Sequence, residues 1–267
     1  MESPKSQITK EQIAQYNKDG IVCLRDVFDL KWIEFLREAA KEAQKNPGPQ
    51  AEAYTKEGEK GGFFGDLELS LRLPKFKQFA FESPAAKIVQ TIMQSEKVNF
   101  FYDHLIIKEP GTRERTPWHQ DMPYWAVKGN QVCTIWLPLD PIEKSNCVEY
   151  VKSSHSWGKT YNPQNFMDGS EYDNANEYTM PDIEANRNDY DIIAFDMQAG
   201  DCLVFHGMTI HGAGGNELTT SRRALATRWT GDDARYHIRK WKTAIPTENP
   251  GLKDGDILDC ERFPKII

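Results

Sequence analysis

The sequence predicts a mainly β protein with peripheral helices, built as a sandwich or jelly roll. From about residue 98 onward, short runs rich in β-branched and aromatic residues alternate with Gly, Pro and Asn, which is typical of strands joined by turns. Hydrophobic residues make up 39% of the chain and aromatic residues 11%, enough to fill a sizeable core, so we expect one domain over residues 1–267. The runs that we interpret as strands are residues 21–24, 98–108, 132–139, 148–152, 202–205 and 225–229.

Residues 1–97 are expected to be mainly helical and to pack outside the main core. Thr9 and Gln12 form a capping-box pattern that starts a short helix. Asp29 can cap a longer helix, whose apolar residues recur at helical spacing until an Asn-Pro-Gly-Pro sequence ends it. A third helix is expected to begin at Ser83 and Pro84, because proline fits the first helical position.

The jelly-roll part, residues 98–267, contains one long segment without periodicity. Residues 162–191 are acidic, rich in Asn and too long for an ordinary connection. We expect this segment to be either a lid over a functional site or an excursion on the surface.

Charge and cysteine usage exclude several classes of function. The formal net charge is -7, and Lys and Arg are scattered along the chain, so nucleic acid is not an expected partner. The five cysteines are odd in number and have no CxxC spacing, which indicates reduced thiols. The N-terminal segment is polar and no run approaches 18 apolar residues, so we expect a soluble, cytoplasmic protein that does not enter a membrane.

A metal site is suggested by His119 and Asp121, which stand two residues apart. In an extended segment, residues at this spacing lie on the same face. His206 and His211 follow in the Gly-rich stretch FHGMTIHGAGG, and either can supply a third ligand. Two histidines and one carboxylate form the facial triad of non-haem iron(II) oxygenases, which leaves metal positions open for other ligands.

An arginine pair follows this stretch and suggests the cosubstrate. Arg222 and Arg223 enter the last predicted strand shortly after His211. A planar guanidinium is well suited to hold the distal carboxylate of an oxo acid such as 2-oxoglutarate through two hydrogen bonds. One arginine of such a pair can equally be an ordinary surface residue.

Nearly the whole chain resembles the phytanoyl-CoA dioxygenase family of iron(II)/2-oxoglutarate oxygenases. The segments that carry the resemblance are ITKEQIAQYNKDGIVCLRDVF, KEPGTRERTPWHQDMPYW, IWLPLD, SNCVEYVKSSHSWG, GDCLVFHGMTIHGAGGN and SRRALATRW. The resemblance implies a double-stranded β-helix, or jelly roll, with helices packed outside. It also implies that His119, Asp121 and His211 are the metal ligands, because His206 comes too early relative to Arg222.

The resemblance also implies which residues contact 2-oxoglutarate. The family's arginine lies 11 positions after the distal histidine, which favours Arg222 and leaves Arg223 for solvent or a salt bridge. Trp136 corresponds to a tryptophan that can contact the cosubstrate, although it can equally belong to the core. Tyr102 is a further candidate, and its neighbour His104 is interpreted as a strand residue that can face the pocket.

The activity implied by the resemblance uses iron(II), 2-oxoglutarate and O2, with ascorbate as the reductant in vitro, and releases succinate and carbon dioxide. Hydroxylation of a C–H bond in a small organic molecule is expected, with desaturation or cyclisation as alternatives. Halogenating relatives have a small residue in place of the carboxylate ligand, so Asp121 argues against halogenation. An acyl-CoA substrate would favour a basic groove, which this acidic chain does not suggest. Aromatic and apolar residues are expected to line the pocket: Phe63, Phe64, Met122, Pro123, Tyr124, Trp125 and Trp229.

Two other interpretations fit part of the pattern. A cupin-like protein could bind metal or a small ligand without turnover, and a hydrolase could use a zinc-bound water on two histidines and an aspartate. The hydrolase gives no role to Arg222. The sequence specifies neither the primary substrate nor the oligomeric state.

Overall fold

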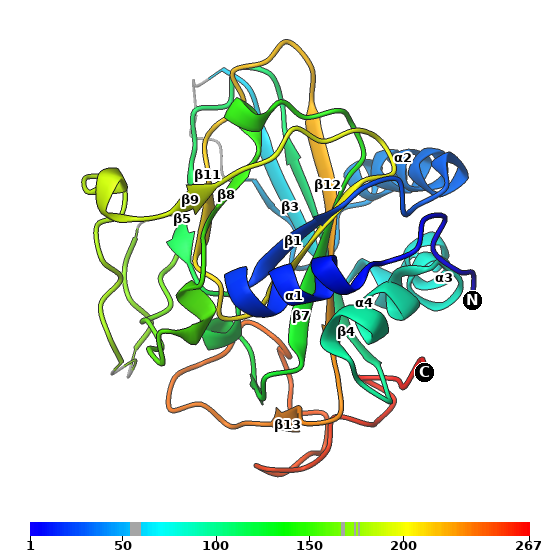
Figure 1. Cartoon of the computed structure of the whole chain (residues 1–267), viewed down its shortest axis with the longest axis vertical. Helices are drawn as coiled ribbons and strands as arrows, with labels where there is room; N and C mark the ends of the chain where they lie inside the picture. Colours follow the sequence, from blue (N-terminus) through cyan, green and yellow to red (C-terminus); the bar gives the residue numbers. More distant parts are fainter. Residues whose placement is uncertain (54–59, 167–168, 174, 176) are drawn as a thin grey trace.

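The protein consists of two facing β-sheets with helices on the outer face of the larger sheet (Figure 1). The structure is a computed structural model that describes residues 1–53, 60–166, 169–173, 175 and 177–267. The main sheet has seven strands in the order β1-β10-β7-β12-β4-β3-β2, and the smaller sheet has four in the order β5-β11-β8-β9. This arrangement confirms the predicted jelly roll with peripheral helices.

The strands of the main sheet are antiparallel to their neighbours. Their bounds are β1 Ile21–Leu24, β2 Glu52–Ala53, β3 Phe63–Leu67, β4 Asn99–Lys108, β7 Val132–Pro138, β10 Cys202–His206 and β12 Arg222–Thr230. The smaller sheet contains β5 Thr116–His119, β8 Val148–Val151, β9 Ile192–Ile193 and β11 His211–Ala213. A separate pair joins β6 Val127–Lys128 to β13 Arg235–Tyr236.

Side chains alternate between the two faces of the main sheet, as the period of a strand requires. On β12, Leu225 and Trp229 belong to the apolar cluster beneath the helices. Ala224 and Ala226 belong instead to the cluster between the two sheets. The space between the sheets is therefore lined by one face of β12, and the functional site lies there.

Four helices in the described part of the chain cover the outer face: α1 Lys10–Asp19, α2 Leu30–Lys45, α3 Pro74–Glu82 and α4 Ala85–Met93. The Thr9 capping box and the Asp29 cap are present as predicted. The expected third helix is α4, with Pro84 as its N-cap. The helices lie on the outer face of the main sheet, as expected, and their apolar residues share the largest apolar cluster with that sheet.

Some elements were not predicted. Helix α3 ends at Glu82, and Ser83 and Pro84 separate it from α4, against which it packs. Strands β3, β5 and β11 are short or Gly-rich and lack the alternation that predicts a strand. No helix in the described residues is both long and apolar enough for a membrane span.

Candidate active site

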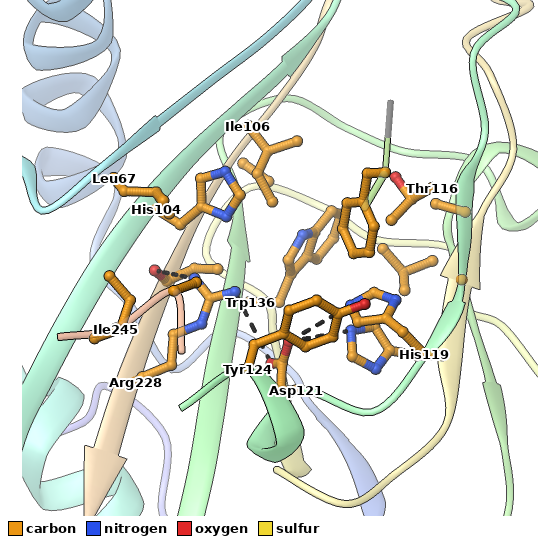
Figure 2. A pocket seen from close by; sticks show the side chains of 18 of the residues that line it. Leu67, His104, Ile106, Thr116, His119, Asp121, Tyr124, Trp136, Arg228 and Ile245 are labelled. Carbon is orange, nitrogen blue, oxygen red and sulfur yellow. Dashed lines mark hydrogen bonds and ion pairs between the residues drawn. The ribbon is translucent and has the colours of Figure 1, made fainter. Parts of the chain in front are cut away.

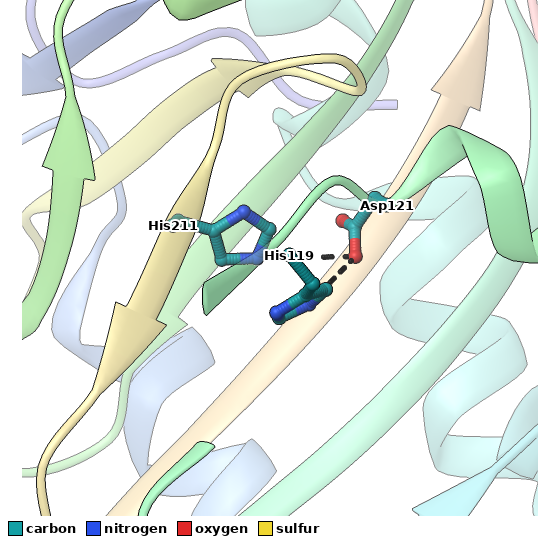
Figure 3. Close-up of side chains that lie close together, drawn as sticks. All are labelled: His119, Asp121 and His211. Atoms are coloured by element: carbon teal, nitrogen blue, oxygen red, sulfur yellow. Dashed lines mark ion pairs between the residues drawn. The ribbon is translucent and has the colours of Figure 1, made fainter. Parts of the chain in front are cut away.

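Three predicted ligand residues meet at the edge where β5 and β11 pair. His119 ends β5 and His211 begins β11, and the two residues lie opposite each other in the antiparallel register. Asp121 follows β5 by two residues. One donor atom from each of the three side chains lies within 4.8 Å of the other two (Figure 3). All three are buried, so the structure brings the predicted triad together.

Backbone carbonyls fix the orientation of both imidazole rings. Nδ1 of His119 lies 2.8 Å from the carbonyl oxygen of Pro117, and Nδ1 of His211 lies 3.0 Å from that of Thr209. A carbonyl accepts only a donated proton, so Nδ1 carries a hydrogen in both rings, and Nε2 is the nitrogen that can offer a lone pair to a metal. Burial and the neighbouring His119 lower the pKa of His211 to about 3, which keeps its ring neutral. Neutral imidazoles with free Nε2 atoms are suited to bind a metal.

The two carboxylate oxygens of Asp121 have different surroundings. Oδ1 lies 3.5 Å from Nε2 of His119 and 3.8 Å from Nε2 of His211. Oδ2 accepts a hydrogen bond from the Thr134 hydroxyl at 3.0 Å. Burial acts to raise the pKa of Asp121, but the Arg228 guanidinium and His119 together hold it below its usual value. The carboxylate is therefore ionised, with one oxygen facing the histidines.

The turn that leads to His211 is attached to the end of helix α1. The carbonyl oxygen of Gly20 accepts hydrogen bonds from the backbone N–H of His206, at 2.9 Å, and from the Thr209 hydroxyl, at 2.8 Å. Gly20 has φ 76°, and an added Cβ would lie 2.4 Å from Nδ1 of His155. Glycine is needed here because both its positive φ and this close approach exclude a side chain.

His206, the alternative third ligand, lies on the other side of this turn. Its Nδ1 accepts a hydrogen bond from the backbone N–H of Met208, and its ring lies 5.3 Å from that of His155. It is not part of the His119, Asp121 and His211 group.

The triad opens into a cavity of about 260 Å³ between the two sheets (Figure 2). One end lies deep in the jelly roll and is lined by Trp136, Val148, Tyr150, Phe205, Ala213 and Arg222. The other end opens past Leu67, His104, Tyr124, Phe166, Tyr172 and Ile245. Phe63 lies at the Arg222 end, because it pairs with Lys108, which in turn pairs with Arg222. Phe166 lies over the triad, since its ring centroid is 4.8 Å from that of His119.

Arg222 is a buried cation at the deep end of the cavity. Its Nη1 donates to the carbonyl oxygen of Asn146 at 2.5 Å, and its Nη2 to that of Gly214 at 3.3 Å. Among the described residues, no carboxylate forms an ion pair with Arg222. Burial lowers the pKa of Arg222 to about 10, so it stays charged at neutral pH. A charged guanidinium without a carboxylate partner is suited to bind an anion.

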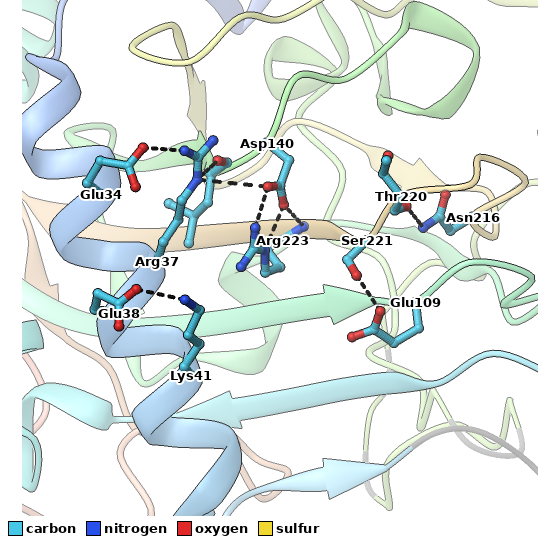
Figure 4. Close-up of polar contacts among 11 residues, drawn as sticks. Glu34, Arg37, Glu38, Lys41, Glu109, Asp140, Asn216, Thr220, Ser221 and Arg223 are labelled. Atoms are coloured by element: carbon cyan, nitrogen blue, oxygen red, sulfur yellow. Dashed lines mark hydrogen bonds and ion pairs between the residues drawn. The ribbon is translucent and has the colours of Figure 1, made fainter.

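Arg223 points to the opposite face of the sheet and forms two hydrogen bonds with Asp140, at 2.8 and 2.5 Å (Figure 4). It is therefore the salt-bridge residue of the pair, as predicted.

Trp136 and Tyr102 both line the cavity, but at different places. Trp136 lies on β7 opposite Ala226 and belongs to the apolar cluster between the sheets. Tyr102 lies on β4 opposite Arg228, six residues along β12 from Arg222. A contact between Tyr102 and the cosubstrate therefore could not involve the Arg222 end, and both cosubstrate assignments stay predictions.

Arg228 is a site residue that the sequence interpretation missed. It is 5% exposed and lines the cavity, and its Nη2 lies 3.9 Å from Oδ2 of Asp121. The inward orientation of Arg228 could have been predicted from the sequence. Because alternate residues of a strand share a face, a strand that points Arg222 inward also points Arg228 inward.

The expected apolar lining is correct in part. Phe63, Tyr124 and Trp125 line the cavity. Phe64 and Trp229 do not, because both pack in the cluster beneath the helices on the opposite face of the sheet.

Comparison with known families identifies the chain's relatives. The family model described as Phytanoyl-CoA dioxygenase (PhyH) matches residues 16–224. A probable phytanoyl-CoA dioxygenase of Caenorhabditis elegans is 26% identical over 157 residues, which cover 56% of this chain and 49% of the relative. The peroxisomal phytanoyl-CoA dioxygenase of Bos taurus is 24% identical over 173 residues, covering 60% and 50%. The match spans about half the length of these relatives.

Solved structures share the fold at low identity. The carbocyclase SnoK from nogalamycin biosynthesis has a TM-score of 0.78 at 18% identity, covering 100% of both chains. The epimerase SnoN, in complex with Fe3+, alpha ketoglutarate and nogalamycin RO, has a TM-score of 0.76 at 18% identity, covering 97% of this chain and 98% of SnoN. EctD from S. alaskensis, with 2-oxoglutarate and 5-hydroxyectoine, has a TM-score of 0.69 at 17% identity, covering 96% and 88%.

Proposed function

Because the chain belongs to the phytanoyl-CoA dioxygenase family, we propose that it is an iron(II)- and 2-oxoglutarate-dependent oxygenase that oxidises a C–H bond of a small organic molecule. The observation that carries this proposal is that two kinds of group line one cavity. A triad with free donor atoms and a buried arginine without a carboxylate partner line the same space.

The donor set fits iron(II). Nε2 of His119, Nε2 of His211 and Oδ1 of Asp121 face one another, while Nδ1 of each ring and Oδ2 are held by other partners. Two imidazoles and one carboxylate are the ligands of the facial triad, which leaves the remaining metal positions for cosubstrate and oxygen. When bound, iron(II) with 2-oxoglutarate and O2 supplies the oxidising chemistry, in which the oxo acid is converted to succinate and carbon dioxide.

Arg222 is assigned to the distal carboxylate of 2-oxoglutarate. Its backbone partners hold the guanidinium in place without neutralising it, so a positive charge is ready at the deep end of the cavity. The nearby Lys108 does not compete strongly for the anion, because burial, and then Arg222, lower the pKa of Lys108 to about 6. Trp136 forms part of the apolar wall beside this end, and it is assigned the role of excluding water from the cosubstrate.

Part of the 162–191 segment is assigned the role of a lid. Gln164, Asn165, Phe166 and Tyr172 line the cavity, and the ring of Phe166 lies over His119. A cover of this kind shields the reacting atoms from water and bulk solvent. Residues 167, 168, 174 and 176 lie outside the described part of the chain, and the assignment rests on the described residues alone.

Hydroxylation is the assigned reaction, with desaturation and cyclisation as alternatives that use the same oxidant. The structural neighbours include an epimerase and a carbocyclase, so the fold is compatible with more than one outcome. The substrate is assigned to the class of free small molecules.

The test measures metal binding and turnover separately. Mn(II), a redox-stable substitute, should raise the melting temperature of the parent protein, because a ligand that binds the folded state stabilises it by about 2.7 kcal/mol at 100 times its Kd. His211→Ala should lose this shift and all iron-dependent succinate release. His206→Ala is the matched control, and it should keep both. If His206→Ala loses them while His211→Ala keeps them, the third ligand is wrong, and if no variant or parent releases succinate from 2-oxoglutarate, the oxygenase assignment fails.

A further inference from the structure

We propose that the primary substrate carries an anionic group, a carboxylate, that pairs with Arg228 at the open end of the cavity. This inference rests on the proposed function and names the chemical class of its substrate.

Arg228 is a second cation, distinct from the one assigned to 2-oxoglutarate. Arg222 and Arg228 lie on the same face of β12, six residues apart, which corresponds to about 20 Å along an extended strand. Ala224 and Ala226 lie between them on the cavity face, so small side chains leave space from one cation to the other. One 2-oxoglutarate molecule at Arg222 therefore does not reach Arg228, whose ion pair in the described part of the chain is the long one with Asp121, at 3.9 Å.

The hydrogen-bonding groups of Arg228 are mostly unused. Nη1 donates to the carbonyl oxygen of Ala226 at 3.0 Å. Nε is buried and has no acceptor in the described part of the chain. Nη2 faces Oδ2 of Asp121 at 3.9 Å, too far for a hydrogen bond (Figure 2). The guanidinium carbon lies 4.8 Å from the Tyr102 ring and 5.9 Å from the Trp125 ring.

The charges around the cavity also favour an anionic substrate. Asp121 is the buried acid that lines the described cavity, whereas Glu52 is exposed at its mouth. With iron(II) and doubly charged 2-oxoglutarate bound, the two arginines and the metal exceed Asp121 and the oxo acid by one positive charge. Buried charges in proteins are normally paired, and a monoanionic substrate would complete the balance. A neutral or cationic substrate would leave that charge uncompensated.

The rest of the open end indicates the body of this molecule. His104 lies diagonally from Arg228, on the neighbouring strand, and its ring has no hydrogen-bond partner among the described residues (Figure 2). Burial lowers the pKa of His104 to about 3, so the ring is neutral and offers one donor and one acceptor. Tyr124, Phe166 and Ile245 supply aromatic and apolar walls. We therefore expect a carboxylate on a compact, largely apolar body.

The experiment compares matched acids and amides. Parent protein is loaded with Mn(II) and saturating 2-oxoglutarate without oxygen, so that the Arg222 end is occupied and no turnover occurs. Acetate and acetamide, hexanoate and hexanamide, and phenylacetate and phenylacetamide are then titrated. Paramagnetic broadening of their proton resonances measures both Kd and proximity to the metal. At least one acid should bind about 10-fold or more tightly than its amide, since hydrogen bonds to charged groups are the strong ones.

Variants test whether Arg228 is the source of the preference for acids over amides. Arg228→Gln should reduce the acid-to-amide ratio to about one, and Arg228→Lys should restore part of it. Arg235→Gln is the matched control, because Arg235 also donates to backbone carbonyls but does not line the cavity, and its ratio should equal that of the parent. Since Arg228 is buried, the melting temperature and the Mn(II) Kd are measured for each variant.

The outcomes separate this inference from the proposed function. If Mn(II) and 2-oxoglutarate do not bind to the parent, both the proposed function and this inference are wrong. If they bind but amides bind as well as acids, if no pair binds, or if Arg228→Gln keeps the parent ratio, the inference alone is overturned. Suppose that the Arg228 variants lose Mn(II) affinity and that the parent binds acid and amide equally well. Arg228 would then be a residue that positions Asp121, and it would not bind the substrate.

Discussion

Replacing Arg222 by lysine should raise the KM for 2-oxoglutarate by about 10- to 100-fold. A guanidinium has five N–H donors. The carbonyl oxygens of Asn146 and Gly214 use two of them, so enough remain for a two-pronged contact with a carboxylate. Lysine keeps the charge but loses that geometry. The loss of one charge-assisted hydrogen bond costs about 1.5 to 3 kcal/mol, which corresponds to the expected change in KM.

The assay is succinate release at varied 2-oxoglutarate, with the Mn(II) Kd measured alongside. Metal binding should stay near the parent value, because Arg222 contacts none of the three ligand side chains in the described structure. Arg223→Lys is the matched control: Arg223 pairs with Asp140 on the other face, so its KM should not change. A raised KM in Arg223→Lys, with a parent-like KM in Arg222→Lys, would refute the reasoning and transfer the role to Arg223.

Three further perturbations test the supports of the site. Thr134→Val removes the hydroxyl that holds Oδ2 of Asp121 and should weaken Mn(II) binding by about 10-fold or more, whereas an unchanged Kd in a calorimetric titration would contradict that role. Gly20→Ala adds a Cβ at positive φ and in close contact, so it should lower the unfolding free energy in urea by about 3 kcal/mol. Gly158→Ala, also at positive φ but with no heavy atom within 4 Å, should cost about 1 kcal/mol, and equal effects would argue against the contact. Burial lowers the pKa of Lys108 in the folded protein to about 6, whereas in the unfolded chain it is about 10. Between about pH 6 and pH 10, Lys108 is therefore protonated in the unfolded chain and neutral in the folded protein. Unfolding free energy should therefore rise with pH in this window, by up to about 1.4 kcal/mol per pH unit, and Lys108→Met should flatten the slope between pH 7 and pH 9. Parallel slopes in the two proteins would show that Lys108 is not the source.

The long, regular strands were predictable because their sequences alternate or are continuously apolar. Strand β12 is an example: the run predicted over residues 225–229 was correct but too short, since the strand begins at Arg222. A strand that starts with charged residues does not look like a core strand. Arg222 and Lys108 are nevertheless buried side by side, because the cavity and backbone carbonyls accommodate them.

The pair His119 and Asp121 was predictable from spacing and the third ligand, His211, from the family resemblance, while the surroundings of the triad were not predictable. His119 and Asp121 are two residues apart, but Thr134 reaches Asp121 from another strand, and only the pairing of the sheets brings it there. The same limit explains Trp229. Its aromatic character suggested the pocket, but its parity on β12 places it on the face opposite Arg228. Whether a side chain lines the pocket depends on which face of its strand it occupies, and the residue type alone does not determine that face.

The attachment of Gly20 to the turn before His211 has a consequence for the order of assembly. Gly20 and Thr209 are 189 positions apart in the chain, so their hydrogen bond forms only when the two ends of the jelly roll have met. Contacts of such high sequence separation are entropically costly and slow to form. During synthesis this contact cannot form before Thr209 has left the ribosome, so we expect the turn before the distal histidine to be attached late. Metal affinity should accordingly appear late during refolding, after most of the β-structure.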